Sequence, residues 1–174
     1  MHSQIDPEFE ALPLCGELQL PADPAATARL GEQLGAHLRC GDVLALVGDL
    51  GAGKTTLVRG LARGLGVEDA DAVASPTYLL VIEHQGPKPL RHADAYLPDK
   101  LSGFLDDGGL DYLMSDEAVV AVEWADRVAG LMPPGALWLR LIVEANAFRK
   151  IELRCQSPES YPWLGEIGRI GRSM

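Results

Sequence analysis

Residues 43–56 read VLALVGDLGAGKTT, and this stretch decides the fold. Its first five residues form a continuous apolar run, which is typical of a strand buried on both faces of a parallel sheet. The glycines that follow let the backbone curl so that successive N–H groups surround an anion. The pattern G-x-x-x-x-G-K-[ST] is met by Gly48, Gly53, Lys54 and Thr55, which predicts a phosphate-binding P-loop.

The residues at the end of this loop have the chemistry that a nucleotide requires. Lys54 can place a positive charge on the β- and γ-phosphates, and the Thr55 hydroxyl can bind Mg²⁺. The helix that follows adds its N-terminal dipole and its free N–H groups. The alternative is a glycine-rich turn that binds nothing. The buried strand before the loop and the helix after it favour the phosphate-binding interpretation.

Strands and helices alternate along the rest of the chain. Strands are predicted near Leu18 and over residues 43–47, 77–84, 90–96, 118–124, 136–145 and 148–155. Helices are predicted over 22–38, with Asp23 as N-cap and Pro24 at the first position, over 55–66, closed by Gly64 and Gly66, and as two short helices within 101–114, broken at Gly108–Gly109.

This order predicts an α/β fold with a P-loop NTPase-like sheet, which is parallel in its centre, has antiparallel edge strands and carries helices on both faces. The prediction is one domain over residues 1–174, in which residues 1–10 form a flexible extension.

The composition narrows the classes of function. No apolar run approaches the roughly 18–20 residues that cross a bilayer, and the first residues lack the basic and apolar regions of a signal peptide. We therefore expect a cytoplasmic protein with no membrane partner. The formal net charge of −10 argues against binding of a nucleic-acid backbone by this chain alone. Any role on nucleic acid is expected to work through a partner.

Two carboxylates and one threonine complete the candidate site. Asp94 in LRHADAY and Glu123 in AVVAVEW lie near the carboxyl ends of predicted strands, the edge where open α/β sheets bind ligands. Each can hold Mg²⁺ or orient the attacking water, and the pattern does not separate these roles. The alternative for each is a surface or capping carboxylate. Thr77 in SPTY can sense the γ-phosphate, or it belongs to a Ser-Pro turn that opens a strand.

Together these motifs resemble the bacterial TsaE family, ATPases that act in forming threonylcarbamoyladenosine on tRNA. The resemblance covers residues 24–155 and rests on GDLGAGKTTLVRG (48–60), SPTY (75–78), HADAY (92–96), EW (123–124) and the late arginine of FRKIEL. One position departs from the family pattern, because Leu97 stands where the family usually has an arginine after HxDxY.

The resemblance implies ATP and Mg²⁺ as cofactors and gives each residue a role. Lys54, Asp94, Glu123 and Thr77 are the expected catalytic residues, and Thr55, Asp94 and Glu123 the expected metal ligands. The expected nucleotide-binding residues are Leu50, Gly51, Ala52, Gly53, Lys54, Thr55 and Thr56, with further contacts from Pro24, Asp126 and Arg149. Trp124 is interpreted as a packing residue, and His92 as a core residue or a neighbour of the site.

The family also implies partners. A TsaE-like protein hydrolyses ATP while bound to a TsaB–TsaD complex, TsaD carries the transfer chemistry, and tRNA is reached only through that complex. Hydrolysis by the isolated chain is expected to be weak. Two alternatives remain at this point: a nucleotide-gated binding module with little turnover, and a small-molecule kinase. The kinase interpretation lacks an arginine-rich lid segment in the sequence.

Overall fold

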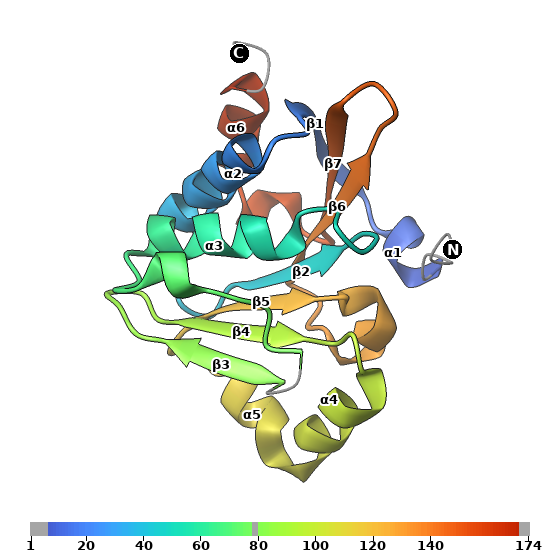
Figure 1. The fold of residues 1–174 in the computed structure, drawn as a ribbon. Helices are drawn as coiled ribbons and strands as arrows, with labels where there is room; N and C mark the ends of the chain where they lie inside the picture. The colour runs from blue at the N-terminus through green and yellow to red at the C-terminus, as the bar shows by residue number, and fades with distance from the viewer. Residues whose placement is uncertain (1–6, 78–79, 171–174) are drawn as a thin grey trace.

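A seven-stranded mixed sheet organises the chain in the order β1-β7-β6-β2-β5-β4-β3 (Figure 1). The computed structural model describes residues 7–77 and 80–170. The strands are β1 (Leu14–Pro21), β2 (Val43–Val47), β3 (Val81–His84), β4 (Leu90–Asp94), β5 (Val119–Glu123), β6 (Leu137–Val143) and β7 (Phe148–Arg154).

The sheet has a parallel centre and antiparallel edges. Strand β2 pairs in parallel with β5 and β6, and β4 pairs in parallel with β5. Strands β1, β7 and β3 join the sheet through antiparallel pairs. This arrangement confirms the predicted fold class. The edge strand β3 is shorter than the segment predicted over 77–84, and Thr77 lies before it, while residues 78–79 fall outside the described residues.

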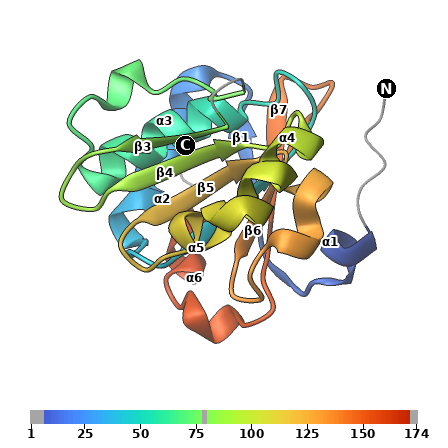
Figure 2. The same ribbon diagram turned by 90° about the horizontal axis from the view of Figure 1, so that it is seen from below.

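Helices cover both faces of the sheet (Figures 1 and 2). The longer ones are α2 (Pro24–His37) and α3 (Lys54–Leu65). The shorter helical segments are α1 (Pro7–Ala11), η1 (Ala70–Ala72), α4 (Pro98–Phe104), η2 (Leu105–Gly109), α5 (Leu110–Leu113), η3 (Ala125–Leu131), η4 (Pro158–Ser160) and α6 (Leu164–Ile170). Asp23 caps α2 by accepting from the Ala26 N–H at 2.8 Å, as predicted. None of the helices in the described part of the chain is long and apolar enough to cross a membrane.

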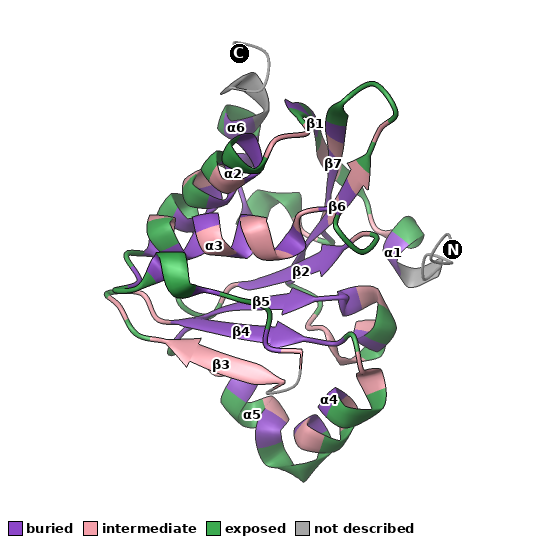
Figure 3. Cartoon of the chain, viewed as in Figure 1, coloured by how far each residue is buried: buried purple, intermediate pink, exposed green. Residues whose placement is uncertain are grey.

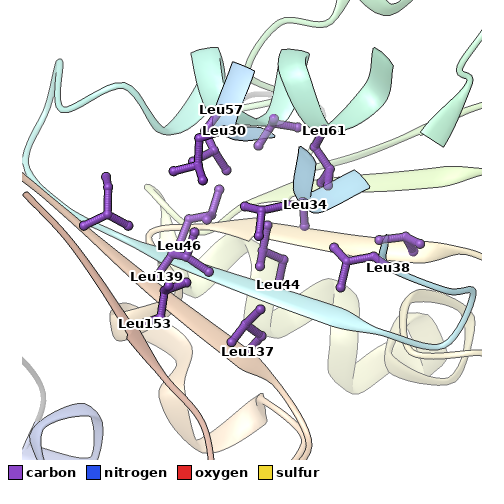
Figure 4. Close-up of a cluster of buried hydrophobic side chains, with 14 of the residues drawn as sticks. Leu30, Leu34, Leu38, Leu44, Leu46, Leu57, Leu61, Leu137, Leu139 and Leu153 are labelled. Carbon is purple, nitrogen blue, oxygen red and sulfur yellow. The ribbon is translucent and has the colours of Figure 1, made fainter. Parts of the chain in front are cut away.

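Two apolar layers result, one on each face of the sheet. Leucines of α2 and α3 pack against leucines of β2, β6 and β7 on one face (Figure 4). Residues of α4, η2, α5 and η3 pack on the other face. Every residue of β2, β4 and β5 is therefore buried, whereas β3 at the edge is only half-buried (Figure 3). The continuous apolar run that predicted β2 follows from this double cover.

The backbones of α2 and α3 touch, because each helix has two glycines four residues apart. A Cβ atom on Gly60 would lie 2.0 Å from the Ala28 carbonyl oxygen, and one on Gly64 would lie 2.1 Å from that of Glu32. A Cβ atom on Gly31 of α2 would lie 2.1 Å from the Leu57 oxygen. No side chain larger than hydrogen fits these positions without separating the helices.

The end of α3 therefore differs from the prediction. Gly64 does not close the helix, because it belongs to this contact and the helix continues to Leu65. Gly66 ends the helix in the left-handed conformation, with φ of 80°.

The N-terminal segment also differs in part from the prediction. Residues 1–6 of the expected flexible extension lie outside the described residues, but residues 7–11 form α1. Phe9 is fully buried, and its ring centroid lies 5.9 Å from that of Trp138 on β6. Burial of this aromatic ring fixes the segment against the sheet.

We predict that Gly60→Ala destabilises the protein, although alanine favours helix more than glycine by about 1 kcal/mol. The added methyl group would overlap the Ala28 backbone, and overpacking of this kind costs about 1–3 kcal/mol. Urea unfolding measures the effect. Gly103→Ala in α4 is the control, because nothing lies within 4 Å of its Cβ position. An equal change in unfolding free energy for both variants would contradict the close helix contact.

Candidate functional site

A pocket of about 530 Å³ opens at the carboxyl ends of the parallel strands. It lies between the β2–α3 loop and the ends of β4 and β5, the part of an open α/β sheet where ligands bind. Its lining consists of Leu50, Gly51, Gly53, Lys54, Thr55, Thr56, Ser75, Thr77, Asp94, Tyr96, Glu123 and Trp124. Most of the residues predicted from the sequence therefore lie around one cavity.

The loop before α3 curls around one side of this pocket. Gly51 and Gly53 have φ angles of 79° and 103°, a region where side chains other than hydrogen are strained. The helix begins at Lys54, and its first N–H groups have no partner within the helix. Such a helix start favours a bound anion. Ala52, in the same loop, is buried and does not line the pocket.

Lys54 is the cation of the loop, and it is almost fully buried. Its Nζ donates to the carbonyl oxygens of Gly48 and Asp49 at 2.6 and 3.0 Å and lies 3.6 Å from the centroid of the Trp124 ring. Burial lowers the pKa of Lys54, while the nearby carboxylates, Glu123 foremost, act in the opposite direction. The lysine is thus held against its own loop, beside the space where an anion would enter.

Glu123 joins the loop helix to the sheet. It is the last residue of β5 and is buried. The Thr55 hydroxyl lies 2.8 and 3.0 Å from its two carboxylate oxygens and donates its proton to this pair. His92 Nε2, on β4, lies 2.8 Å from Glu123 Oε1. The carboxylate is therefore held between α3 and β4.

Asp94 lies beside Glu123, since the two residues are register partners across β4 and β5. Its Oδ2 accepts hydrogen bonds from Ser75 and from Thr77, the latter at 2.9 Å, and its Oδ1 accepts from the Tyr96 N–H at 2.7 Å. Asp94 is thus bound to the 75–77 loop, whereas Glu123 is bound to α3. The two acids, equivalent in the sequence pattern, have different attachments.

These oxygens suit a hard divalent cation. The Thr55 hydroxyl and the two carboxylates supply ligands of the kind that Mg²⁺ prefers, and all three groups line the same pocket. Within residues 7–77 and 80–170, no three His, Cys, Asp or Glu side chains form a ready metal-binding cluster. A magnesium ion here would take further ligands from phosphate and water, as Mg²⁺ commonly does.

Besides Ala52, three predicted contacts lie away from the pocket lining. Pro24 opens α2, and Asp126 lies in η3, where its charge acts on Lys54. Arg149 on β7 is buried behind the loop: a Cβ atom on Gly53 would lie 3.3 Å from its Cζ. Arg149 also donates to the Thr27 hydroxyl of α2, and burial lowers its pKa. The nucleotide contacts expected from these residues stay predictions.

Sequence reasoning missed part of the aromatic side of the pocket. Trp124 is buried, as its packing interpretation requires, but it also lines the pocket and has a φ of 58°. Its ring meets that of Tyr96 edge-on, with the centroids 5.3 Å apart. The guanidinium of Arg127 lies 4.6 Å from the Trp124 ring and 4.9 Å from the Tyr96 ring. Ser75 and Tyr96 belong to the SPTY and HADAY motifs, so these motifs could have indicated that both residues are part of the site.

Comparison with known proteins gives consistent matches. The sequence model of the family described as "Threonylcarbamoyl adenosine biosynthesis protein TsaE" matches residues 21–151. The chain is 46% identical over 119 residues to the tRNA threonylcarbamoyladenosine biosynthesis protein TsaE of Streptomyces coelicolor, covering 64% of this chain and 76% of that protein. It is 38% identical over 125 residues to the protein of the same name from Treponema pallidum, covering 72% of this chain and 90% of that one.

A solved structure matches the fold as well. The crystal structure of Bacillus subtilis YdiB superposes with a TM-score of 0.67 and 28% sequence identity. The match covers 88% of this chain and 95% of that chain.

Proposed function

The chain belongs to the TsaE family, and we propose that it binds and hydrolyses ATP with Mg²⁺ in support of a TsaB–TsaD complex that forms threonylcarbamoyladenosine on tRNA. One observation carries the proposal. A P-loop lysine and threonine, two strand-end carboxylates and the Thr77 hydroxyl all line one pocket at the carboxyl edge of the sheet.

The groups that line the pocket take different roles in the proposed phosphoryl transfer. Loop N–H groups and the Lys54 ammonium bind the phosphates, and Thr55, Glu123 and Asp94 supply oxygens to the metal. When bound, Mg²⁺ neutralises charge on the transferred phosphoryl group. Thr77, hydrogen-bonded to Asp94, links the metal side of the pocket to the 75–77 loop.

The charges of the pocket lining support a mechanism in which the rate of ATP hydrolysis depends on partner proteins. Among the residues that the structure places in its lining, Lys54 is the one cation. An arginine supplied in trans adds roughly 10³–10⁵ in rate to such reactions. The chain alone is therefore proposed to bind ATP and to hydrolyse it slowly, in the cytoplasm. Its net charge of −10 fits a protein that reaches tRNA only through TsaB and TsaD.

Two other functions use the same pocket. A nucleotide-gated binding module would hold ATP with little turnover even beside its partners. A small-molecule kinase would need its own cations around the transferred phosphate, and the absence of arginine from the described pocket lining disfavours it. A screen for phosphorylated products tests the kinase directly.

Lys54→Ala is expected to lower ATP binding or hydrolysis by about 100-fold or more, because it removes the cation of the phosphate-binding loop. Calorimetric titration with ATP and a steady-state ATPase assay measure the effect. Lys100→Ala, which removes an exposed lysine, is the control and leaves both quantities unchanged. Normal ATP binding and hydrolysis by a folded Lys54→Ala protein would refute the phosphate-binding assignment.

Asp94→Asn and Glu123→Gln are each expected to weaken Mg²⁺-dependent hydrolysis, because each replaces a carboxylate of the proposed metal site. ATP binding without metal survives better, since the loop N–H groups and Lys54 remain. Hydrolysis measured against Mg²⁺ concentration, with ATP binding in chelator as the reference, separates the two effects. Unchanged hydrolysis by Glu123→Gln would assign that residue a structural role.

Partner dependence is tested with Thr77→Ala. The variant loses the 2.9 Å hydrogen bond between the 75–77 loop and Asp94, so it should impair stimulation by TsaB and TsaD more than ATP binding. ATPase rates with and without the partner pair measure this for wild type, Thr77→Ala and the exposed control Ser160→Ala. Fast turnover by the isolated wild-type chain, indifferent to the partners, would reject the mechanism.

A further inference from the structure

His92 contacts the Glu123 carboxylate from the neighbouring strand β4. Its Nε2 lies 2.8 Å from Oε1, and both side chains are almost completely removed from solvent. His92 precedes Asp94 by two residues on β4, so the two side chains lie on the same face of the sheet. The histidine does not line the pocket. Any effect it has on the reaction must pass through Glu123.

The partners of the imidazole ring fix its tautomer. The Glu123 carboxylate accepts, so Nε2 must carry the proton that is donated to it. His92 Nδ1 is buried and has no hydrogen-bond partner among the described residues. A proton on Nδ1 would leave both Nδ1 and the carboxylate contact unsatisfied. The geometry therefore requires a ring protonated at Nε2.

We propose that His92 is a positioning residue, which holds the Glu123 carboxylate in the orientation that a metal ion shared with Thr55 requires. The inference rests on the proposed ATPase function. Among the described residues, two side chains form hydrogen bonds with Glu123, those of Thr55 and His92. If the Thr55 oxygen bound a metal ion, the hydrogen bond from His92 would still hold the carboxylate.

Asp94 explains why Glu123 needs this support. The two acids are register partners on adjacent strands, so two carboxylates lie side by side and repel each other when both are charged. Asp94 is held by Ser75, Thr77 and the Tyr96 N–H. Glu123 has one more rotatable bond than aspartate and would turn away from its neighbour without a fixed donor. Partners of metal-binding carboxylates commonly matter in this way.

Two polar substitutions of similar size distinguish loss of Glu123 positioning from general destabilisation of the protein. In His92→Gln the amide nitrogen takes the place of Nε2 and can still donate to Glu123. In His92→Asn the amide nitrogen takes the place of Nδ1 and falls short of the carboxylate. His84→Gln is the control, because the His84 ring lies 6.4 Å from that of His92 and its Nε2 has no partner among the described residues.

We expect His92→Asn to raise the Mg²⁺ concentration for half-maximal ATPase activity by about 10–100-fold, the range typical for loss of such a partner. Calorimetric titration should show the same loss for ADP with Mg²⁺, and unchanged affinity for ADP in chelator. His92→Gln and His84→Gln should stay within about threefold of wild type in every measurement.

The outcomes distinguish this inference from the function on which it rests. If wild type binds and hydrolyses ATP with Mg²⁺ but His92→Gln and His92→Asn behave alike, the positioning role is wrong and the ATPase stands. If wild type shows no Mg²⁺-dependent nucleotide binding, both are wrong. Nitrogen-15 NMR of the wild-type histidines gives a test that needs no variant. A His92 ring protonated at Nε2 supports the inference, and one protonated at Nδ1 alone overturns it.

Discussion

The backbone contact between α2 and α3 is the constraint on which the site depends. Helix α3 begins at Lys54, so its position decides where the glycine-rich loop between β2 and α3 opens. The glycines of the two helices bring the backbones so close that α3 has little room to slide or rotate. Arg149 extends this support, because it packs behind Gly53 and donates to Thr27 near the start of α2. A loop rich in glycine can thus keep one shape, because the helix that follows it is fixed.

The two acids of the site owe their different attachments to the sheet. Both end buried parallel strands, so the sequence pattern does not separate their roles. In three dimensions Glu123 contacts the first turn of α3 and the core histidine, while Asp94 contacts the 75–77 loop. A change at Asp94 therefore acts first on the 75–77 loop. A change at Glu123 acts first on α3, the helix that carries Lys54 and Thr55. Under the proposed function, a ligand that contacts Asp94 would therefore act on the 75–77 loop through these hydrogen bonds.

Features that depend on neighbouring residues could be predicted from the sequence, whereas features that depend on contacts between distant residues could not. The strand β2, its loop and the cap at Asp23 are specified by neighbouring residues, and the structure has them as expected. The predicted helix end at Gly64 is wrong, because the role of this glycine depends on the carbonyl of Glu32, on another helix. Phe9 was missed because a single aromatic residue in a five-residue helix has no periodicity. The His92 contact is equally invisible, since it depends on a register between strands whose residues lie 31 positions apart.

The charge balance of the pocket explains why a cation and an anion would have to enter together under the proposed function. Lys54 is surrounded by the carboxylates of Glu123, Asp126, Asp94 and Asp49, which oppose the effect of burial on its pKa. Two unit charges 4 Å apart interact by about 4 kcal/mol at an effective dielectric constant of 20, so each nearby carboxylate repels a phosphate appreciably. One lysine cannot offset that repulsion as well as bind the phosphate. A divalent cation held by these carboxylates would supply the positive charge that offsets this repulsion. Under the proposed function, these acids would make the pocket favour a metal–nucleotide pair over the free nucleotide.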